Sequence, residues 1–263
     1  MEIHLTIQGP GALAVLAALT LGGCRNPDPA AERADSVPVV RDGPFGRGAI
    51  TGVVRFVGTA PANPPIDMRA APQCRAIYHG APQQLSVVVN PNGTLANVFV
   101  HVIHGLPPGS RYAAPADTML VTQRGCQYHP RVLGVMVGQA LAFRNDDVVP
   151  HRLEASGVKT RPLTRVQPPG RRSAHVFRNG DVMVPLECGM HPWMRAYVGI
   201  LPHPFFATTN RSGRFTIPRL PPGTYTLEAW HEGYGRRIAT VSVTDSTTTH
   251  VTFSFAATPD GSS

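Results

Sequence analysis

The chain has 263 residues, of which 26 are glycine and 27 are proline, and its formal net charge is +8. The glycines and prolines separate short apolar runs rich in valine and threonine, which is typical of an all-β protein with many turns and argues against disorder. A chain of this length can hold one large domain or two small ones.

The N-terminus has the pattern of an export signal. Residues 12–21 form an apolar run of signal-peptide length, too short to span a bilayer, and Leu-Gly-Gly-Cys follows at residues 21–24. This tetrapeptide resembles the lipobox of bacterial lipoproteins, which implies that residues 1–24 are a signal peptide and that Cys24 is lipidated. The stretch before the run holds Glu2 and His4 but no Lys or Arg, unlike an ordinary signal, and a buried apolar helix stays open as the alternative.

Residues 25–46 are rich in proline, alanine and charge, and they indicate a flexible tether between the lipid and the folded part. We therefore expect an exported protein, on the periplasmic or outer-surface face, anchored to the membrane through Cys24. Nucleic acid is not an expected partner there. The basic charge, which is almost all arginine, could instead steer an acidic redox partner or lie against anionic lipid, or could serve solubility alone.

Alternating apolar residues and turn signals predict strands along the rest of the chain. The expected strands before the C-terminal segment are 50–58, 85–89, 98–103, 119–122, 132–137, 139–145, 175–178, 182–187 and 195–201. In the C-terminal segment we expect a strand–turn–strand over 208–217, a turn and strand over 220–230, and strands over 238–243 and 249–255. No amphipathic helix of normal length is expected after residue 24.

One motif carries recognisable chemistry. Cys188, His191 and Met194 occupy the pattern C-x-x-H-x-x-M, and His151 lies upstream in the separate stretch 145–151. One thiolate, two imidazoles and one thioether are the ligands of a blue-copper electron-transfer site, with a weak axial methionine. Pro192 disfavours helical geometry at His191, so a stiff turn between strands is expected. Zinc or no metal stays open, although structural zinc favours four Cys and His ligands and does not usually take a thioether.

The cysteines divide by their expected roles. With Cys24 assigned to lipid and Cys188 to the metal, Cys74 and Cys126 remain. Disulfides persist outside the cytoplasm, so we expect this pair to be bonded. Such a bond would stabilise the fold by about 4 kcal/mol on the chain-entropy model. The alternative is a pair of inert or metal-binding thiols.

The remaining histidines are expected to be structural. His101 and His104 lie three positions apart on a predicted strand, so they should point to opposite faces. His129 completes a second C-x-x-H pattern, but no further ligand lies near it. His203 and His231 are expected in loops or at strand ends, where they make hydrogen bonds.

Residues 137–151 together with the C-x-x-H-x-x-M motif resemble the cupredoxin family, and the spacing from Cys to Met is that of amicyanin. The resemblance covers roughly residues 117–204 and implies a Greek-key β-sandwich that binds one type 1 copper ion. It implies that Met194 is the axial ligand, that His151, Cys188 and His191 are equatorial, and that electrons enter and leave at His191.

The same resemblance implies an apolar patch around the electron exit, formed by Pro150, Pro192 and Trp193. Two positions depart from the family pattern. Arg152 stands where cupredoxins usually have an asparagine that tethers the two ligand loops, and Gly189 stands where they often have Ser or Thr. Hydrogen bonds around the ligands tune a metal site, so the reduction potential cannot be transferred from the family.

Residues 207–256 resemble the carboxypeptidase regulatory-like domain, a smaller transthyretin-like β-sandwich. The pattern G-x-F-x-I-x-x-L-P-P-G-x-Y-x-L runs from Gly213 to Leu227, and the usual opening strand stands instead at residues 48–54. We therefore expect the cupredoxin domain, 106–205, to be inserted between the two parts of the regulatory-like domain, 47–105 and 206–257, before a tail at 258–263. Domains in series are the alternative.

The whole arrangement resembles bacterial exported proteins of the plastocyanin-like or methylamine-utilization type. The expected function is to carry single electrons between redox partners, without enzymatic activity, since no catalytic motif is present. Two alternatives stay open. One is copper handling in the periplasm, and the other is binding of carbohydrate or peptide by the β-sandwich.

Overall fold

The computed structural model describes residues 43–257. The predicted signal peptide, Cys24, most of the predicted tether and the tail at 258–263 lie outside the described residues. The described chain is nearly all β, as the sequence predicted, with one helix of four residues, α1 (Pro72–Arg75). No helix in this part of the chain is long and apolar enough to cross a membrane.

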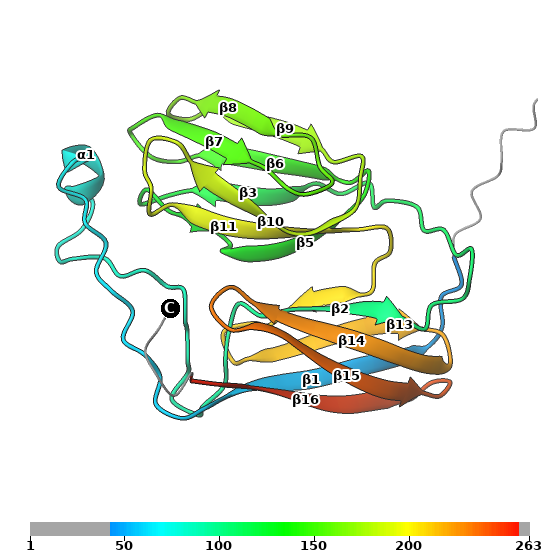
Figure 1. Cartoon of the computed structure of the whole chain (residues 1–263). Helices are drawn as coiled ribbons and strands as arrows, with labels where there is room; N and C mark the ends of the chain where they lie inside the picture. Colours follow the sequence, from blue (N-terminus) through cyan, green and yellow to red (C-terminus); the bar gives the residue numbers. More distant parts are fainter. Residues whose placement is uncertain (1–42, 258–263) are drawn as a thin grey trace, which may run out of the picture. The chain divides into compact units, whose positions relative to one another are not determined.

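The strands at the two ends of the described chain form one β-sandwich, which we call the terminal sandwich (Figure 1). One of its sheets has the order β13-β1-β16 and the other the order β12-β2-β14-β15. Their bounds are β1 (Gly48–Val57), β2 (Phe99–His104), β12 (Phe206–Thr208), β13 (Arg214–Leu220), β14 (Gly223–His231), β15 (Gly235–Val243) and β16 (Thr248–Ala256).

The intervening strands form a second β-sandwich, the central sandwich. Its sheets have the orders β5-β11-β10-β7-β8 and β4-β3-β6-β9. The bounds are β3 (Met119–Gln123), β4 (Tyr128–His129), β5 (Val132–Met136), β6 (Ala140–Asn145), β7 (His151–Ala155), β8 (Leu163–Gln167), β9 (Arg172–Val176), β10 (Asp181–Cys188) and β11 (Arg195–Leu201).

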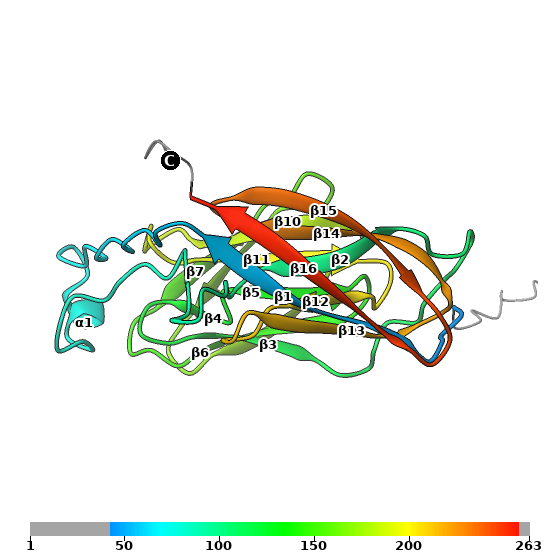
Figure 2. The same cartoon turned by 90° about the horizontal axis from the view of Figure 1, so that it is seen from below.

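β1 fixes the topology of the terminal sandwich. It pairs in parallel with β16, from Ala49 opposite Thr248 to Val57 opposite Ala256, and antiparallel with β13 (Figure 2). Its side chains alternate between buried and more exposed positions, because one face of the sheet covers a core and the other faces outward. The first and last described strands are therefore neighbours in one sheet.

The segment between β1 and β2 differs from the prediction. The strand expected over 85–89 is absent, and only an isolated bridge joins Val89 to Leu95. Instead, residues 58–98 form a long irregular excursion that carries α1. Asn63 holds its two arms together, because its Nδ2 donates to the Val87 carbonyl and its Oδ1 accepts the Val87 amide.

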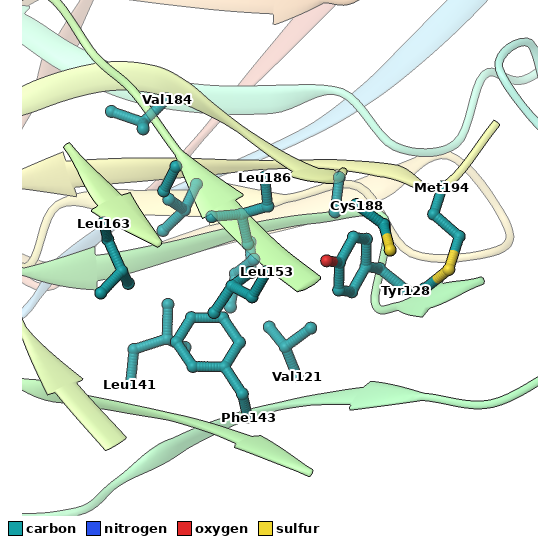
Figure 3. Packing of buried hydrophobic residues seen from close by; sticks show 14 of the residues in the cluster. Val121, Tyr128, Leu141, Phe143, Leu153, Leu163, Val184, Leu186, Cys188 and Met194 are labelled. Atoms are coloured by element: carbon teal, nitrogen blue, oxygen red, sulfur yellow. The ribbon is translucent and has the colours of Figure 1, made fainter. Parts of the chain in front are cut away.

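Each sandwich has its own hydrophobic core. The core of the central sandwich includes Val121, Leu141, Phe143, Leu153, Leu163 and Leu186 (Figure 3). Tyr128, Cys188 and Met194 lie at one end of this core in the same view. The strands therefore bring the candidate metal ligands to the edge of a dry core.

A small third cluster joins the two sandwiches. Phe99 of β2 packs with Val132, Met183 and Leu201 of the central sandwich. The side chains of Arg131 and Glu232 form an ion pair across the same boundary. β2 is buried over most of its length, because Phe99 packs in this cluster while Val100 and Val102 pack in the terminal core.

Candidate metal centre

The loop between β10 and β11 carries three of the four predicted ligands. β10 ends at Cys188 and β11 begins at Arg195. Inside the loop, the His191 amide donates to the Cys188 carbonyl at 3.1 Å, and the Met194 amide donates to the His191 carbonyl at 3.0 Å. These two turns wind the backbone tightly enough to direct all three side chains inward.

The fourth predicted ligand comes from the neighbouring strand. Cys188 pairs with Leu153 in the register of β10 and β7, and His151 begins β7 two residues earlier. Because side chains alternate along a strand, His151 and Leu153 share the face that points into the core. Both side chains are completely buried.

Three donor atoms converge to form a triangle. Nδ1 of His151 and Nδ1 of His191 lie 3.1 Å apart, and Sγ of Cys188 lies 3.8 Å and 3.6 Å from them. Donor atoms that share one transition-metal ion at about 2.0–2.3 Å lie about 3–4 Å from one another. The donor set and its spacing therefore fit a bound ion, and the buried Met194 sulfur lies at the same end of the core (Figure 3).

Asp147 orients His151, and sequence analysis did not identify it. Its Oδ2 lies 3.0 Å from Nε2 of His151, and the carboxylate also accepts the amides of Gly125 and Cys126. Burial opposes the charge of Asp147, but these hydrogen bonds prevail and lower its pKa. With a metal bound in place of the Nδ1 proton, the ring would keep its remaining proton on Nε2, facing Asp147. The only sequence signal was an aspartate four positions before the histidine.

The charge state of Cys188 suits metal binding. Burial opposes the thiolate, but hydrogen bonds from His151 and His191 outweigh it and lower the pKa of Cys188 to about 5. Burial also opposes a charge on His151, but Asp147 and Cys188 raise its pKa. Cys188 is therefore a thiolate at neutral pH, which is the form that binds metal ions.

Cys74 and Cys126 form a disulfide, as predicted from the sequence. Sγ of Cys74 lies 3.5 Å from Nε2 of His191, on the side of the ring opposite the donor triangle. His191 is only 6% exposed. The resemblance implied that its outer edge reaches an apolar surface patch, and the structure differs, because the excursion that carries Cys74 covers that edge.

The predicted residues around the ligands take different positions. Pro150 and Pro192 are exposed, while Trp193 is half-buried and donates from Nε1 to the Cys126 carbonyl at 3.0 Å. Arg152 is exposed and donates from Nη2 to the Gly189 carbonyl at 3.1 Å. That bond joins the two ligand-bearing segments.

A comparison with protein families finds a match for one part of the chain. Residues 195–256 match the carboxypeptidase regulatory-like domain family. The matched range begins at β11, which the structure places in the central sandwich, and continues to the end of β16. No curated protein matches the chain.

Several solved structures resemble part of the chain. A "Novel Purple Cupredoxin from Nitrosopumilus maritimus" is 23% identical, covers 31% of this chain and 98% of its own, and has a TM-score of 0.28. An amicyanin in its Cu(I) form is 22% identical over 40% of this chain and 98% of its own, with a TM-score of 0.30. The chain spans only 25% of the Cu-containing nitrite reductase (NirK) from Thermus scotoductus SA-01, which is 21% identical over 37% of this chain with a TM-score of 0.30.

Proposed function

We propose that the chain is a type 1 copper protein that carries single electrons between redox partners. The observation that supports this most directly is the triangle of two imidazole nitrogens and one thiolate sulfur. This is the donor set that blue-copper sites use, with a methionine as the weak fourth ligand. His151, Cys188 and His191 would hold the ion, with Met194 as a further, weaker ligand.

Bound copper would supply a reversible change of one electron between Cu(I) and Cu(II). The protein's contribution is a set of donors that changes little between these states. Asp147 holds His151 in one tautomer, and the two loop turns hold His191 and Met194. Burial of all four side chains excludes water from the metal. We assign no catalytic step to these residues.

The proposal includes export and a membrane tether through a lipid on Cys24. Labelling with a fatty acid should mark the wild-type chain and not a Cys24→Ser variant.

The proposal also includes an acidic redox partner. Arginines on and beside β8 and β9 support it, because most of them are exposed on one edge of the central sandwich: Arg161, Arg165, Arg171, Arg172 and Arg178.

The visible absorption spectrum of the full chain after addition of Cu(II) tests the copper site. We expect an intense blue band from charge transfer between the Cys188 thiolate and copper, absent in a Cys188→Ser variant. Met190→Leu is the matched control, since Met190 lies in the same loop but is 49% exposed, outside the donor triangle. Voltammetry should then give a reversible one-electron wave. Equal, colourless binding by the wild type and the Cys188 variant would overturn the proposal.

A further inference from the structure

The two ligand histidines present a second face. Each uses Nδ1 toward the donor triangle, so each Nε2 points the other way. Nε2 of His151 faces the carboxylate of Asp147, and Nε2 of His191 faces the disulfide sulfur of Cys74. Two different environments therefore lie behind the two rings.

The environment behind His191 contains a second set of soft ligands. The sulfur atoms of Cys74 and Cys126 and a ring nitrogen of His191 all lie within 4.8 Å of one another. Both cysteines are completely buried. Asp147 is not free to join them, because its two oxygens already accept three hydrogen bonds, from Gly125, Cys126 and His151.

We propose that Cys74 and Cys126, once their disulfide is reduced, form a second metal site for Cu(I), with Nε2 of His191 as the third donor. Thiolates are soft ligands and imidazole suits copper in both oxidation states. In the oxidised chain the two sulfurs are bonded to each other and cannot bind the ion. The redox state of the pair would then decide whether the chain holds one copper ion or two.

The reduction is a thiol–disulfide exchange. A dithiol reductant gives two electrons and two protons to the bond between Cys74 and Cys126, and it leaves as a disulfide itself. Binding of Cu(I) then displaces three protons to the solvent: two from the thiols and one from Nε2 of His191, which carries the ring proton when Nδ1 holds the first ion.

The cover over the pair is thin enough to open locally. Cys74 lies in α1, a helix of four residues without a side-chain cap. Most side chains around it are exposed, and Tyr78 holds the segment by donating its hydroxyl to the Gly125 carbonyl at 2.7 Å. Ile66 and Met68 anchor the start of this segment in the central core, but residues 69–80 bury little besides Cys74. This part can therefore open without global unfolding, which gives a dithiol access to the sulfurs.

The pair is also coupled to the first site through the backbone of Cys126. Its amide donates to Asp147, which orients His151, and its carbonyl accepts Trp193, whose ring packs on His191. Loading of the second site would therefore change the surroundings of both histidines. The proposal goes beyond the electron-carrier function, since a second site could exist whether or not the first carries electrons.

The test is the number of Cu(I) ions bound by the oxidised and the reduced full chain. A Cys24→Ser background removes the thiol that lies outside the described residues. The chain is reduced with a dithiol, freed of it by gel filtration without oxygen, and titrated with Cu(I) against a chromogenic chelator. We expect one ion in the oxidised chain, with one titratable thiol, and two ions in the reduced chain, with three. One ion in both states would overturn the proposal.

Two variants assign the second ion. A reduced Cys188→Ser chain should still bind one Cu(I) tightly, and X-ray absorption should show two sulfur donors and one nitrogen. A Cys74→Ser, Cys126→Ser chain should bind one ion under either condition. A second ion that persists in this double variant would overturn the proposal. The blue band of the oxidised chain reports the first site alone, so failure of one proposal is distinguishable from failure of the other.

Discussion

Both sandwiches bury histidines, but they use them differently. In the central sandwich, His151 and His191 converge on Cys188, and the pKa of His151 is raised. In the terminal sandwich, His203 and His231 each accept a local backbone amide through Nδ1, and burial lowers the pKa of each to about 4. Burial of a histidine alone therefore does not indicate a metal site, whereas convergence of several donor atoms does.

The largest expected effect is a loss of stability without a loss of metal binding, caused by a cavity in the core of the terminal sandwich. Phe255 is completely buried in the terminal core and is not part of the central core. Phe255→Ala should lower the free energy of unfolding by about 3–5 kcal/mol, because it removes apolar contacts and leaves a cavity. Urea unfolding of the apo chain measures this loss. The blue band should persist under all conditions in which the variant is folded. Loss of the band from the folded variant would show that the metal site depends on the terminal sandwich.

Acidic pH should weaken the terminal sandwich through its neutral histidines. The pKa of His231 is near 6.5 in the unfolded chain and about 4 in the folded one, so its stabilising effect is complete above pH 6.5 and is lost as pH falls through 4. The change over the full range is about 3–4 kcal/mol, since one pKa unit corresponds to about 1.4 kcal/mol.

Urea midpoints measured from pH 7 to pH 4 test the contribution of His231. A His231→Gln variant should lose less stability over this range than the wild type. His250→Gln is the matched control, because His250 is exposed on the same sandwich. Equal slopes for all three chains would contradict the assignment.

Removal of the charge behind His151 should weaken the central site. Asp147→Asn keeps the shape of the side chain but loses the carboxylate that fixes the His151 tautomer. Loss of such an orienting partner typically costs 10–100-fold in metal affinity, or about 1.4–2.7 kcal/mol. Competition with a copper chelator measures this change. Asp146→Asn is the control, because Asp146 pairs with the exposed Arg144 instead.

Local patterns predicted much of this molecule. The strands around residues 50, 100, 120, 140, 185, 198 and 225 follow from alternating β-branched residues and turn signals, and the C-x-x-H-x-x-M motif follows from ligand chemistry. Cys74 and Cys126 were paired by elimination, and the structure has that disulfide. The ligand roles of His151, Cys188, His191 and Met194 remain predictions, as do the domain boundaries.

The failures of the sequence analysis share a physical cause. Leu85–Val89 has the composition of a strand, but no neighbouring strand is available to pair with it, and only one bridge forms. β8 was missed because it is short, Arg165 interrupts its apolar pattern, and prolines flank it on both sides. The cover over His191 depends on contact with Cys74, 117 positions away. Each of these features depends on contacts between residues that are far apart in the sequence. The local sequence pattern carries no information about such contacts.

The smallest expected effect is at Arg152. Its side chain is 46% exposed and binds Glu154 and the Gly189 carbonyl. Such exposed contacts are worth about 0–1 kcal/mol, so Arg152→Ala should barely change the urea midpoint or the blue band. The reason is that the Gly189 amide still donates to the Arg152 carbonyl at 2.9 Å, and this backbone bond does not depend on the side chain. A loss of copper affinity as large as that of Asp147→Asn would mean instead that the side chain is the main tether between the two ligand segments.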